Sequence, residues 1–230
     1  MDSEAKEDLL RQIRDEVLNL AASPLRAERV RNGVFPVIGE GSHKAELMFV
    51  GEAPGRNEAA TGRPFCGAAG KVLDGLLASI GVERASVYIT NILKDRPPMN
   101  RDPLPEEIAL YAPFLDRQLS IIRPKIVAAL GRYSMAYLME KFELASELRS
   151  ISQIHGKVYR GTFEKEPIVF VPLYHPAVAI YDRSKLEVLE KDFQIVRDAL
   201  DDKSPAPASI LEPLAKKDKK RESAGRDALF

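Results

Sequence analysis

The sequence predicts a single α/β domain in which a parallel sheet is flanked by helices. Short apolar runs that end in glycine or a polar residue alternate with longer stretches whose apolar residues recur at helical spacing. This alternation is typical of a parallel sheet with helical crossovers. A chain of 230 residues is long enough for one core of this kind but short for two full domains.

The expected elements follow one another along the chain. Apolar residues at helical spacing predict an opening helix from about residue 4 to 20. We then expect strands at 46–52, 87–92 and 125–131, helices that begin near 69, 105 and 132, a hairpin of 157–161 with 167–175, and a closing helix at 184–200. The chain divides into an N-terminal helical segment at 1–32, the α/β domain at 33–201 and a tail at 202–230. The tail is rich in Pro, Ala, Lys and Asp, and we expect it to be disordered.

Composition excludes several classes of protein. The 34 Lys and Arg residues balance 34 Asp and Glu residues, so any affinity for nucleic acid must come from local patches. Cys66 is the single cysteine, which excludes a disulfide framework and a metal or cluster site built mainly from thiolates of this chain. No run of about 18 apolar residues occurs, and the N-terminus is acidic, so we expect a cytoplasmic protein that does not enter a membrane.

Polar or glycine-bearing signatures stand where the expected strands end. These signatures are Gly51-Glu52, Thr90-Asn91, Gly131-Arg132 and His175-Pro176. The carboxyl ends of the strands of an open parallel sheet line one crevice, so residues that are distant in sequence converge there. We therefore expect the functional site at this edge of the sheet.

The segment VGEAPGRNEAATGRPFCGAAGKVLDGLL (50–77) joins the first of these strands to a helix. It lacks the hydroxyl residue that a Walker loop needs after its lysine, and its glycines do not have the spacing of a dinucleotide fingerprint. Two interpretations stay open. The loop is a rigid turn that presents Glu52, Glu58 and Phe65 to a ligand, or it is a conformationally demanding turn without chemistry.

Several motifs occur in a fixed order along roughly two thirds of the chain. They are GEAPG, Glu58, TGRPFCGAAG, YITNI, RPPMNR, LGR and HPA. Through these motifs, the chain resembles the uracil-DNA glycosylase superfamily, and most closely its family 4. The resemblance implies a central four-stranded parallel sheet between helices, in agreement with the strands expected above. It also implies a monomeric enzyme that flips uracil out of single- or double-stranded DNA and hydrolyses its N-glycosidic bond, leaving an abasic site for base excision repair.

The resemblance assigns three residues to the base. Phe65 is expected to stack on the flipped pyrimidine, and Glu58 to line the pocket near C5, where the methyl group of thymine would have to fit. Asn91 is expected to donate its amide hydrogen to uracil O4 and to accept from N3–H. Cytosine presents the opposite polarity at both atoms, so this pairing discriminates between the two bases.

Three further residues bear on the chemistry. His175 is expected to donate an N–H to uracil O2, where charge accumulates as the bond breaks, and a neutral ring suffices for this. Ala53 stands where the best-known family carries an aspartate, and its methyl group cannot act as a base. Glu52 is a candidate for orienting the attacking water, and the identity of the residue that does so stays open.

Two segments are expected to hold the DNA. The expected contacts are Arg96, Asn100, Arg101, Val178, Ile180 and Arg183. The first three belong to a proline-stiffened loop with local positive charge, which suits phosphates. The other three belong to the segment that relatives push into the space left by the flipped base, and its two apolar residues are the expected wedges.

Members of family 4 typically carry a four-iron, four-sulfur cluster held by four cysteines. In this chain the corresponding positions hold Leu20, Ser23, Asp95 and Tyr111. Because no thiolate cage can form, we expect no cluster and no catalytic metal. We expect packing and hydrogen bonds to hold together the segments that a cluster would join. A related branch forms a covalent adduct with DNA through a basic insertion. That insertion is absent after Pro98, so we expect turnover.

Two alternatives to a uracil glycosylase stay open. A non-catalytic DNA-binding module would have kept the pocket and lost its activity together with the cluster. A glycosylase for another deaminated base, hypoxanthine or xanthine, would keep the enzyme and change its substrate, because Ala53 shows that the first motif tolerates change.

Overall fold

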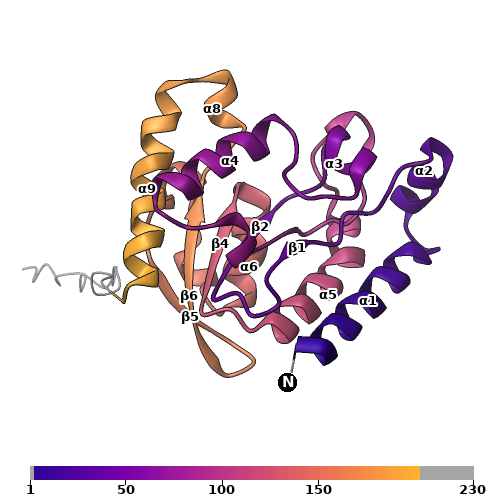
Figure 1. Ribbon diagram of the computed structural model, residues 1–230, viewed down its shortest axis with the longest axis horizontal. Helices are drawn as coiled ribbons and strands as arrows, with labels where there is room; N and C mark the ends of the chain where they lie inside the picture. Colours follow the sequence, from indigo (N-terminus) through magenta and orange to yellow (C-terminus); the bar gives the residue numbers. More distant parts are fainter. Residues whose placement is uncertain (1–2, 203–230) are drawn as a thin grey trace, which may run out of the picture.

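One six-stranded sheet forms the centre of the protein, whose residues 3–202 are described by the structure, a computed structural model (Figure 1). The strands are β1 (Glu40–Gly41), β2 (Leu47–Gly51), β3 (Tyr88–Asn91), β4 (Ile126–Leu130), β5 (Tyr159–Phe163) and β6 (Glu166–Leu173). Their order is β1-β3-β2-β4-β6-β5. The central strands β3, β2, β4 and β6 are parallel, whereas β1 and β5 pair antiparallel at the edges. The predicted four-stranded parallel centre is therefore confirmed, within a larger mixed sheet. The sequence did not indicate β1, which is too short to show a period.

Helices cover both faces of this sheet. They are α1 (Ser3–Leu18), α2 (Pro24–Asn32), α3 (Arg56–Thr61), α4 (Ala68–Ser79), α5 (Pro105–Ile122), α6 (Arg132–Lys141), α7 (Ile151–Ile154), α8 (Val178–Tyr181) and α9 (Ser184–Leu200). Short 3-10 turns occupy 84–86, 98–100 and 145–147. No helix within residues 3–202 has the length and apolar character needed to cross a bilayer. The tail predicted to be disordered falls almost entirely outside the described residues, at 203–230.

The predicted opening helix is present as α1, close to its expected bounds of 4 and 20. It ends at Leu18, and a separate helix, α2, begins at Pro24. The side chain of Ser23 accepts hydrogen bonds from the backbone N–H groups of Leu25 and Arg26, which otherwise lack partners at a helix start. Ser23 is thus the N-cap of α2, with proline in the first turn, where its missing N–H costs nothing.

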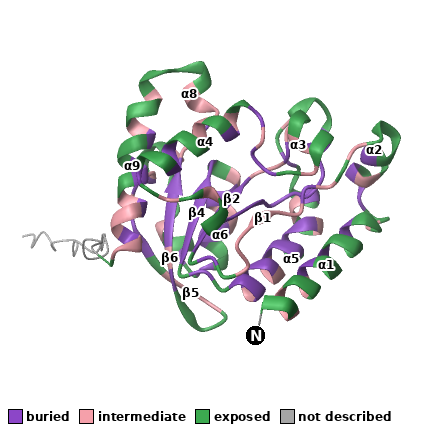
Figure 2. Cartoon of the chain, in the orientation of Figure 1, coloured by how far each residue is buried: buried purple, intermediate pink, exposed green. Residues whose placement is uncertain are grey.

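The strands are buried on both faces, as β2 shows. Leu47 and Phe49 pack with α4 and α9, whereas Met48 and Val50 pack with α1, α5 and α6. All five residues of β2 are buried, which explains why its sequence is continuously apolar rather than alternating. Figure 2 shows the central strands in purple, between helices whose outer faces are green.

The strand order determines where a site can form. From β2, at the centre, the chain passes to β3 on one side and then crosses to β4 on the other. At such a switch point the loops that leave neighbouring strands diverge and open a crevice. The loops after β2, β3, β4 and β6 all reach this edge of the sheet.

Helix α4 approaches the loop before it more closely than a side chain would allow. A Cβ atom on Gly70 would lie 1.8 Å from the carbonyl oxygen of Phe65. Gly75, one turn further along the same helix, has no atom within 4 Å of the place where its Cβ would be. Only the first of these two glycines is therefore required by packing.

We predict opposite effects of alanine at these two positions. Gly70→Ala should lower the free energy of unfolding by about 1–3 kcal/mol, because its methyl group overpacks the contact with the Phe65 backbone. Gly75→Ala should raise the free energy of unfolding by about 0.5–1 kcal/mol, because alanine is the better helix former. Urea denaturation followed by circular dichroism measures both. Equal effects of the two substitutions would contradict the close approach of α4.

Candidate active site

A pocket of about 310 Å³ opens where β2 and β3 end. It is lined by Glu52, Ala53, Pro54, Gly55, Glu58, Phe65, Ala69, Asn91, Pro97, Asn100, Arg101, His175 and Ala177. The structure thus brings together the residues predicted for the base and the chemistry, and two of those predicted for DNA. The four other predicted DNA contacts, Arg96, Val178, Ile180 and Arg183, are not among the lining residues.

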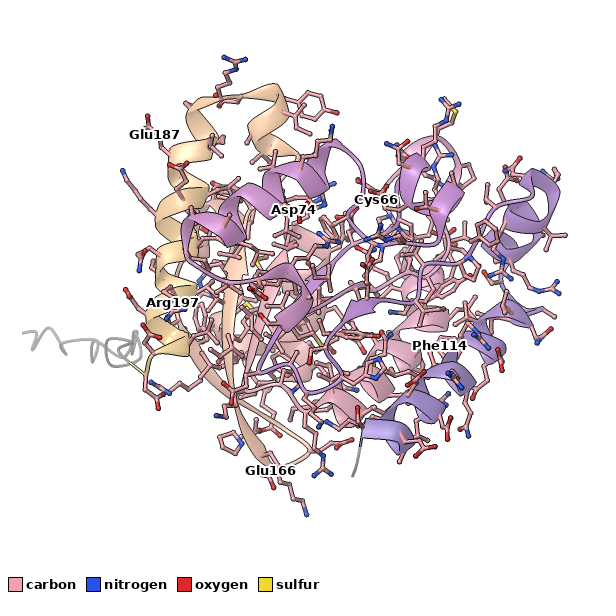
Figure 3. All side chains as sticks on the ribbon, viewed as in Figure 1. Cys66, Asp74, Phe114, Glu166, Glu187 and Arg197 are labelled. Carbon is pink, nitrogen blue, oxygen red and sulfur yellow. The ribbon has the colours of Figure 1, made fainter. Side chains whose placement is uncertain are left out.

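Phe65 occupies the pocket in a conformation that few residues adopt. Its φ of 47° lies in the left-handed region, where a bulky side chain is strained. The ring is buried, and its centroid lies 5.5 Å from that of the His175 ring. The loop that carries Phe65, between α3 and α4, also carries Cys66, which is labelled in Figure 3.

Glu58 holds this loop in place. Its Oε1 accepts hydrogen bonds from the backbone N–H groups of Cys66 (3.0 Å) and Gly67 (2.9 Å). From the other side, Arg84 donates to the carbonyl oxygen of Pro64 at 2.6 Å. These contacts fix the backbone on both sides of Phe65 and stabilise its unfavourable φ.

Asn91 presents an unpaired acceptor in the pocket. Its side chain is buried, and Oδ1 accepts no hydrogen bond from any residue that the structure describes. A buried acceptor without a donor costs about 1–3 kcal/mol. Among the described residues, the hydroxyl of Tyr159 in β5 is the other buried side-chain polar atom without a partner, and it does not line the pocket. Gly51 makes room for it, since a Cβ there would lie 2.3 Å from this oxygen and 2.7 Å from Cζ of Phe65.

His175 is neutral at physiological pH and has a defined tautomer. Burial lowers its pKa to about 4, and the nearby charge of Glu58 only partly opposes this effect. The backbone N–H of Ala177 donates to Nδ1 at 3.2 Å, so the ring proton is on Nε2. The ring therefore offers one N–H donor, at Nε2.

Glu52 is the carboxylate of the pocket with a strongly shifted pKa. Burial, reinforced by the negative charge of Asp102, raises the pKa of Glu52 to about 7, and the Arg132 charge partly opposes the rise. This value lets the carboxyl group exchange a proton near neutral pH. Ala53 also lines the pocket, as predicted, and contributes only a methyl group.

The loop after β3 is braced internally. Arg96 Nε donates to Oδ1 of Asn100 at 2.6 Å, across a turn in which Met99 and Asn100 both have left-handed φ. Arg101 donates to both carboxylate oxygens of buried Glu107, at 2.8 and 2.5 Å. The charge of Arg101 is therefore already neutralised, whereas Arg96 has no carboxylate partner within residues 3–202.

The segment after His175 forms the short helix α8 and a turn into α9. Val178 is partly buried and packs against the core cluster beneath α4 and α9, so its side chain is not free to act as a wedge. Ile180 is 45% exposed, and the next residue, Tyr181, is 90% exposed. Arg183 is exposed as well.

Sequence reasoning did not single out two exposed side chains on segments that follow pocket residues. Met99 is 92% exposed and directly precedes Asn100, a lining residue, and Tyr181 directly follows the predicted wedge Ile180. A large apolar residue in a proline-rich, charged loop is the signal that would have indicated Met99, whereas Tyr181 ends the apolar helix α8 and has no such signal.

The family is now identified by comparison as well as by motif. The profile of the Uracil DNA glycosylase superfamily matches residues 38–202, which contain the whole pocket. The chain belongs to this superfamily. The match confirms the resemblance and the enzyme class that it implied, a hydrolase acting on N-glycosyl bonds.

Similar proteins carry the name type-4 uracil-DNA glycosylase. The chain is 48% identical over 168 residues to that of Saccharolobus solfataricus, which covers 73% of this chain and 77% of the relative. It is 46% identical over 169 residues to that of Archaeoglobus fulgidus, covering 74% and 84%. It is 45% identical over 192 residues to that of Sulfurisphaera tokodaii, covering 83% and 84%.

Three of the four positions at which the resemblance placed cluster ligands belong to a buried hydrogen-bond network. Tyr111 donates its hydroxyl hydrogen to Asp95 Oδ2 at 2.6 Å, and Ser23 Oγ lies 2.8 Å from the Tyr111 hydroxyl oxygen. Arg29 Nη1 donates to both carboxylate oxygens of Asp95, at 2.9 and 3.1 Å. Burial raises the pKa of Asp95, and Tyr111 and Arg29 oppose that rise. Leu20 packs, partly buried, against the core.

These residues do not fit an iron–sulfur cluster. Such a cluster needs thiolate ligands, whereas here a phenol, a hydroxyl and an ion-paired carboxylate fill their places with hydrogen bonds to one another. Within residues 3–202, no group of three or more His, Cys, Asp or Glu side chains is arranged to hold a metal ion. Arg29 also donates to the carbonyl oxygen of Leu18 at 2.8 Å, so the network joins α1, α2, α5 and the loop after β3.

We predict that Asp95→Ala lowers the free energy of unfolding by about 3–5 kcal/mol, because it leaves the buried guanidinium of Arg29 without its partner. Glu16→Ala is the control, since it breaks an ion pair with Arg117 that is exposed. The control should cost less than about 1 kcal/mol. Urea denaturation compares the two variants, and similar losses would show that the Asp95 network contributes no more than a surface pair.

Proposed function

We propose that this protein is a uracil-DNA glycosylase that takes uracil out of the DNA stack and hydrolyses its N-glycosidic bond, leaving an abasic site. The observation that carries the proposal is the buried, unpaired Oδ1 of Asn91 close to the ring of Phe65. A planar base stacked on that ring and carrying an N–H at its edge would satisfy this acceptor. Uracil has such a group at N3.

Recognition follows from the polarity of the amide. Asn91 Oδ1 accepts from N3–H of uracil, and its Nδ2 donates to O4. Cytosine has an acceptor at N3 and a donor at C4, so each mismatched atom would be left buried without a partner, at about 1–3 kcal/mol each. The pairing with Asn91 therefore rejects cytosine.

Bond cleavage depends on His175. The negative charge that develops on uracil O2 is stabilised by the N–H donor at Nε2, in the manner of an oxyanion hole. Because the pKa of His175 is about 4, the ring acts as a neutral donor and does not protonate the leaving base. A partly buried donor that is already oriented needs little reorganisation during the reaction.

We assign the attacking water to Glu52. Glu58 already accepts two backbone hydrogen bonds, and Ala53 has no basic atom, so Glu52 is the pocket carboxylate that suits this role. Glu58 acts on the base indirectly, through the loop that carries Phe65.

The DNA contacts of the proposal differ from the sequence-based expectation. Arg96 and Arg183 bind phosphates, and Arg101 instead orders the loop through Glu107. Ile180 and Tyr181 are the residues exposed enough to enter the space left by the base. The helix α6, which begins at Arg132, offers its N-terminus to the phosphate backbone. Action without a cluster, a monomeric state and a cytoplasmic location remain predictions.

The proposal is tested by base release from a single strand that contains uracil and from U:G and U:A duplexes, detected by alkaline cleavage of the product. We expect release by the wild-type protein, and a loss of about 100-fold or more in His175→Ala, the size typical of a lost oxyanion donor. The variants should be compared at equal folded fraction, checked by circular dichroism. Hypoxanthine and xanthine substrates run in parallel. Release of these bases alone, or uracil-independent binding without release, would overturn the proposal.

We predict that activity rises with pH through the pKa of Glu52, about 7, because the carboxylate form orients the water. Glu52→Gln should have low activity and lack this limb of the profile. The same raised pKa makes the folded state bind the proton more tightly than the unfolded chain does. Its contribution to stability is therefore present at low pH and lost as pH rises through about 7. A pH profile of kcat/KM that is identical in wild type and Glu52→Gln would assign the water to another residue.

A further inference from the structure

Lys94 is a fully buried lysine directly behind the base-recognition residue. Its exposed fraction is 0%, and it is among the largest side chains with no access to solvent. Nζ lies 2.6 Å from the carbonyl oxygen of Asn91, 2.6 Å from Oε1 of Gln118 and 2.9 Å from Oγ1 of Thr90. Lys94 does not line the pocket, so it touches the site only through the backbone of Asn91.

Burying this amine is costly. Among the described residues it has no carboxylate partner, in contrast to Arg29, which is paired with neighbouring Asp95. Burial lowers the pKa of Lys94 well below its ordinary value, because a site without water disfavours the charged form. An apolar side chain would fill the same space without that penalty, so the hydrogen bonds are what distinguishes lysine at this position.

The Asn91 carbonyl needs a donor that the sheet does not supply. Strand β1 pairs with β3 only at Tyr88 and Ile89, so it ends before it reaches Asn91. On the other side of β3, the N–H of Ile92 bonds to the carbonyl oxygen of Gly51 in β2. Lys94 Nζ, at 2.6 Å, therefore takes the place of a neighbouring strand at the Asn91 carbonyl, to which the Thr90 hydroxyl makes a much longer contact, at 3.5 Å.

The amine is held in one position by a second set of hydrogen bonds. Gln118 Nε2 donates to the carbonyl oxygen of Ile38 at 2.8 Å and to the Tyr88 hydroxyl at 3.2 Å, which turns its Oε1 toward Nζ. Thr90 Oγ1 lies 2.6 Å from the same Ile38 oxygen. Whether charged or neutral, an amine has at least two N–H groups, enough for Asn91 and Gln118 at once.

We propose that Lys94 is a positioning residue for base recognition, which anchors the end of β3 so that the Asn91 amide faces the base in one orientation. The inference rests on the proposed function, since it concerns how Asn91 reads uracil. It assigns the specificity of the pocket partly to an atom that touches neither base nor sugar. A longer β1 would have supplied a backbone donor to the Asn91 carbonyl. This chain instead supplies the Lys94 amine, which Thr90 and Gln118 hold in place.

A double-mutant cycle tests this inference. The variants are Lys94→Met, Asn91→Ala and the combination, and the readout is the single-turnover rate of uracil release. If Lys94 acts through Asn91, Lys94→Met should slow release about tenfold in the wild-type background and have little further effect in Asn91→Ala. Its single-turnover rates on uracil and cytosine substrates should also lie closer together than those of the wild type, and Lys94→Gln, which keeps an N–H donor, should recover part of the loss.

Tyr137→Phe is the matched control, because it removes one partly buried hydrogen bond, to Asp116, in helices away from Asn91. It should leave the discrimination between uracil and cytosine unchanged. If Lys94→Met does not fold, Lys94→Gln takes its place in the cycle. Equal losses in both backgrounds would overturn the inference while leaving the proposed function intact. A wild-type protein that releases no uracil would overturn both.

Discussion

The absence of a side chain at Gly51 is the constraint on which the pocket depends. Gly51 ends the central strand, and the place of its Cβ is taken from two directions, by Oδ1 of Asn91 and by the ring of Phe65. One of these residues comes from the neighbouring strand and the other from the loop that leaves β2 itself. Any larger residue at position 51 would separate the stacking surface from the hydrogen-bonding group. The left-handed Phe65, the brace from Glu58 and the close approach of α4 all serve to keep that ring beside Asn91.

Much of this arrangement follows from the sequence. The helices α5 and α9 have strong apolar periods and lie where the sequence predicted them. The convergence of Glu52, Asn91 and His175 follows from the rule that parallel strands end at one edge of a sheet. Local patterns carry this information, because each strand needs only its own apolar run and the residue that terminates it.

Other features depend on contacts between distant segments and carry no local signal. Asp95 pairs with Arg29 across 66 positions of the chain, and Arg101 turns back onto Glu107 because of the path of an irregular loop. Val178 is apolar, as a wedge residue should be, but it packs, partly buried, against the core cluster of α4 and α9. Lys94 follows an apolar run. A charged residue at the end of such a run suggests a surface loop, yet this lysine is fully buried. In each case three-dimensional packing decides the role of the residue.

The pairing of arginines around the pocket has a consequence for how the enzyme moves on DNA. Arg101 and Arg132 already hold carboxylates, so they displace few cations from the duplex when it binds, and the chain as a whole has no net charge. Each phosphate that a protein neutralises contributes about 0.9 to the slope of log affinity against log salt. If the phosphate contacts are limited to the few proposed above, such as those of Arg96 and Arg183, we expect non-specific binding to depend weakly on ionic strength and release from undamaged DNA to be fast. On this proposal, the time spent at a given nucleotide would be governed by whether a base enters the pocket, rather than by attraction to the backbone.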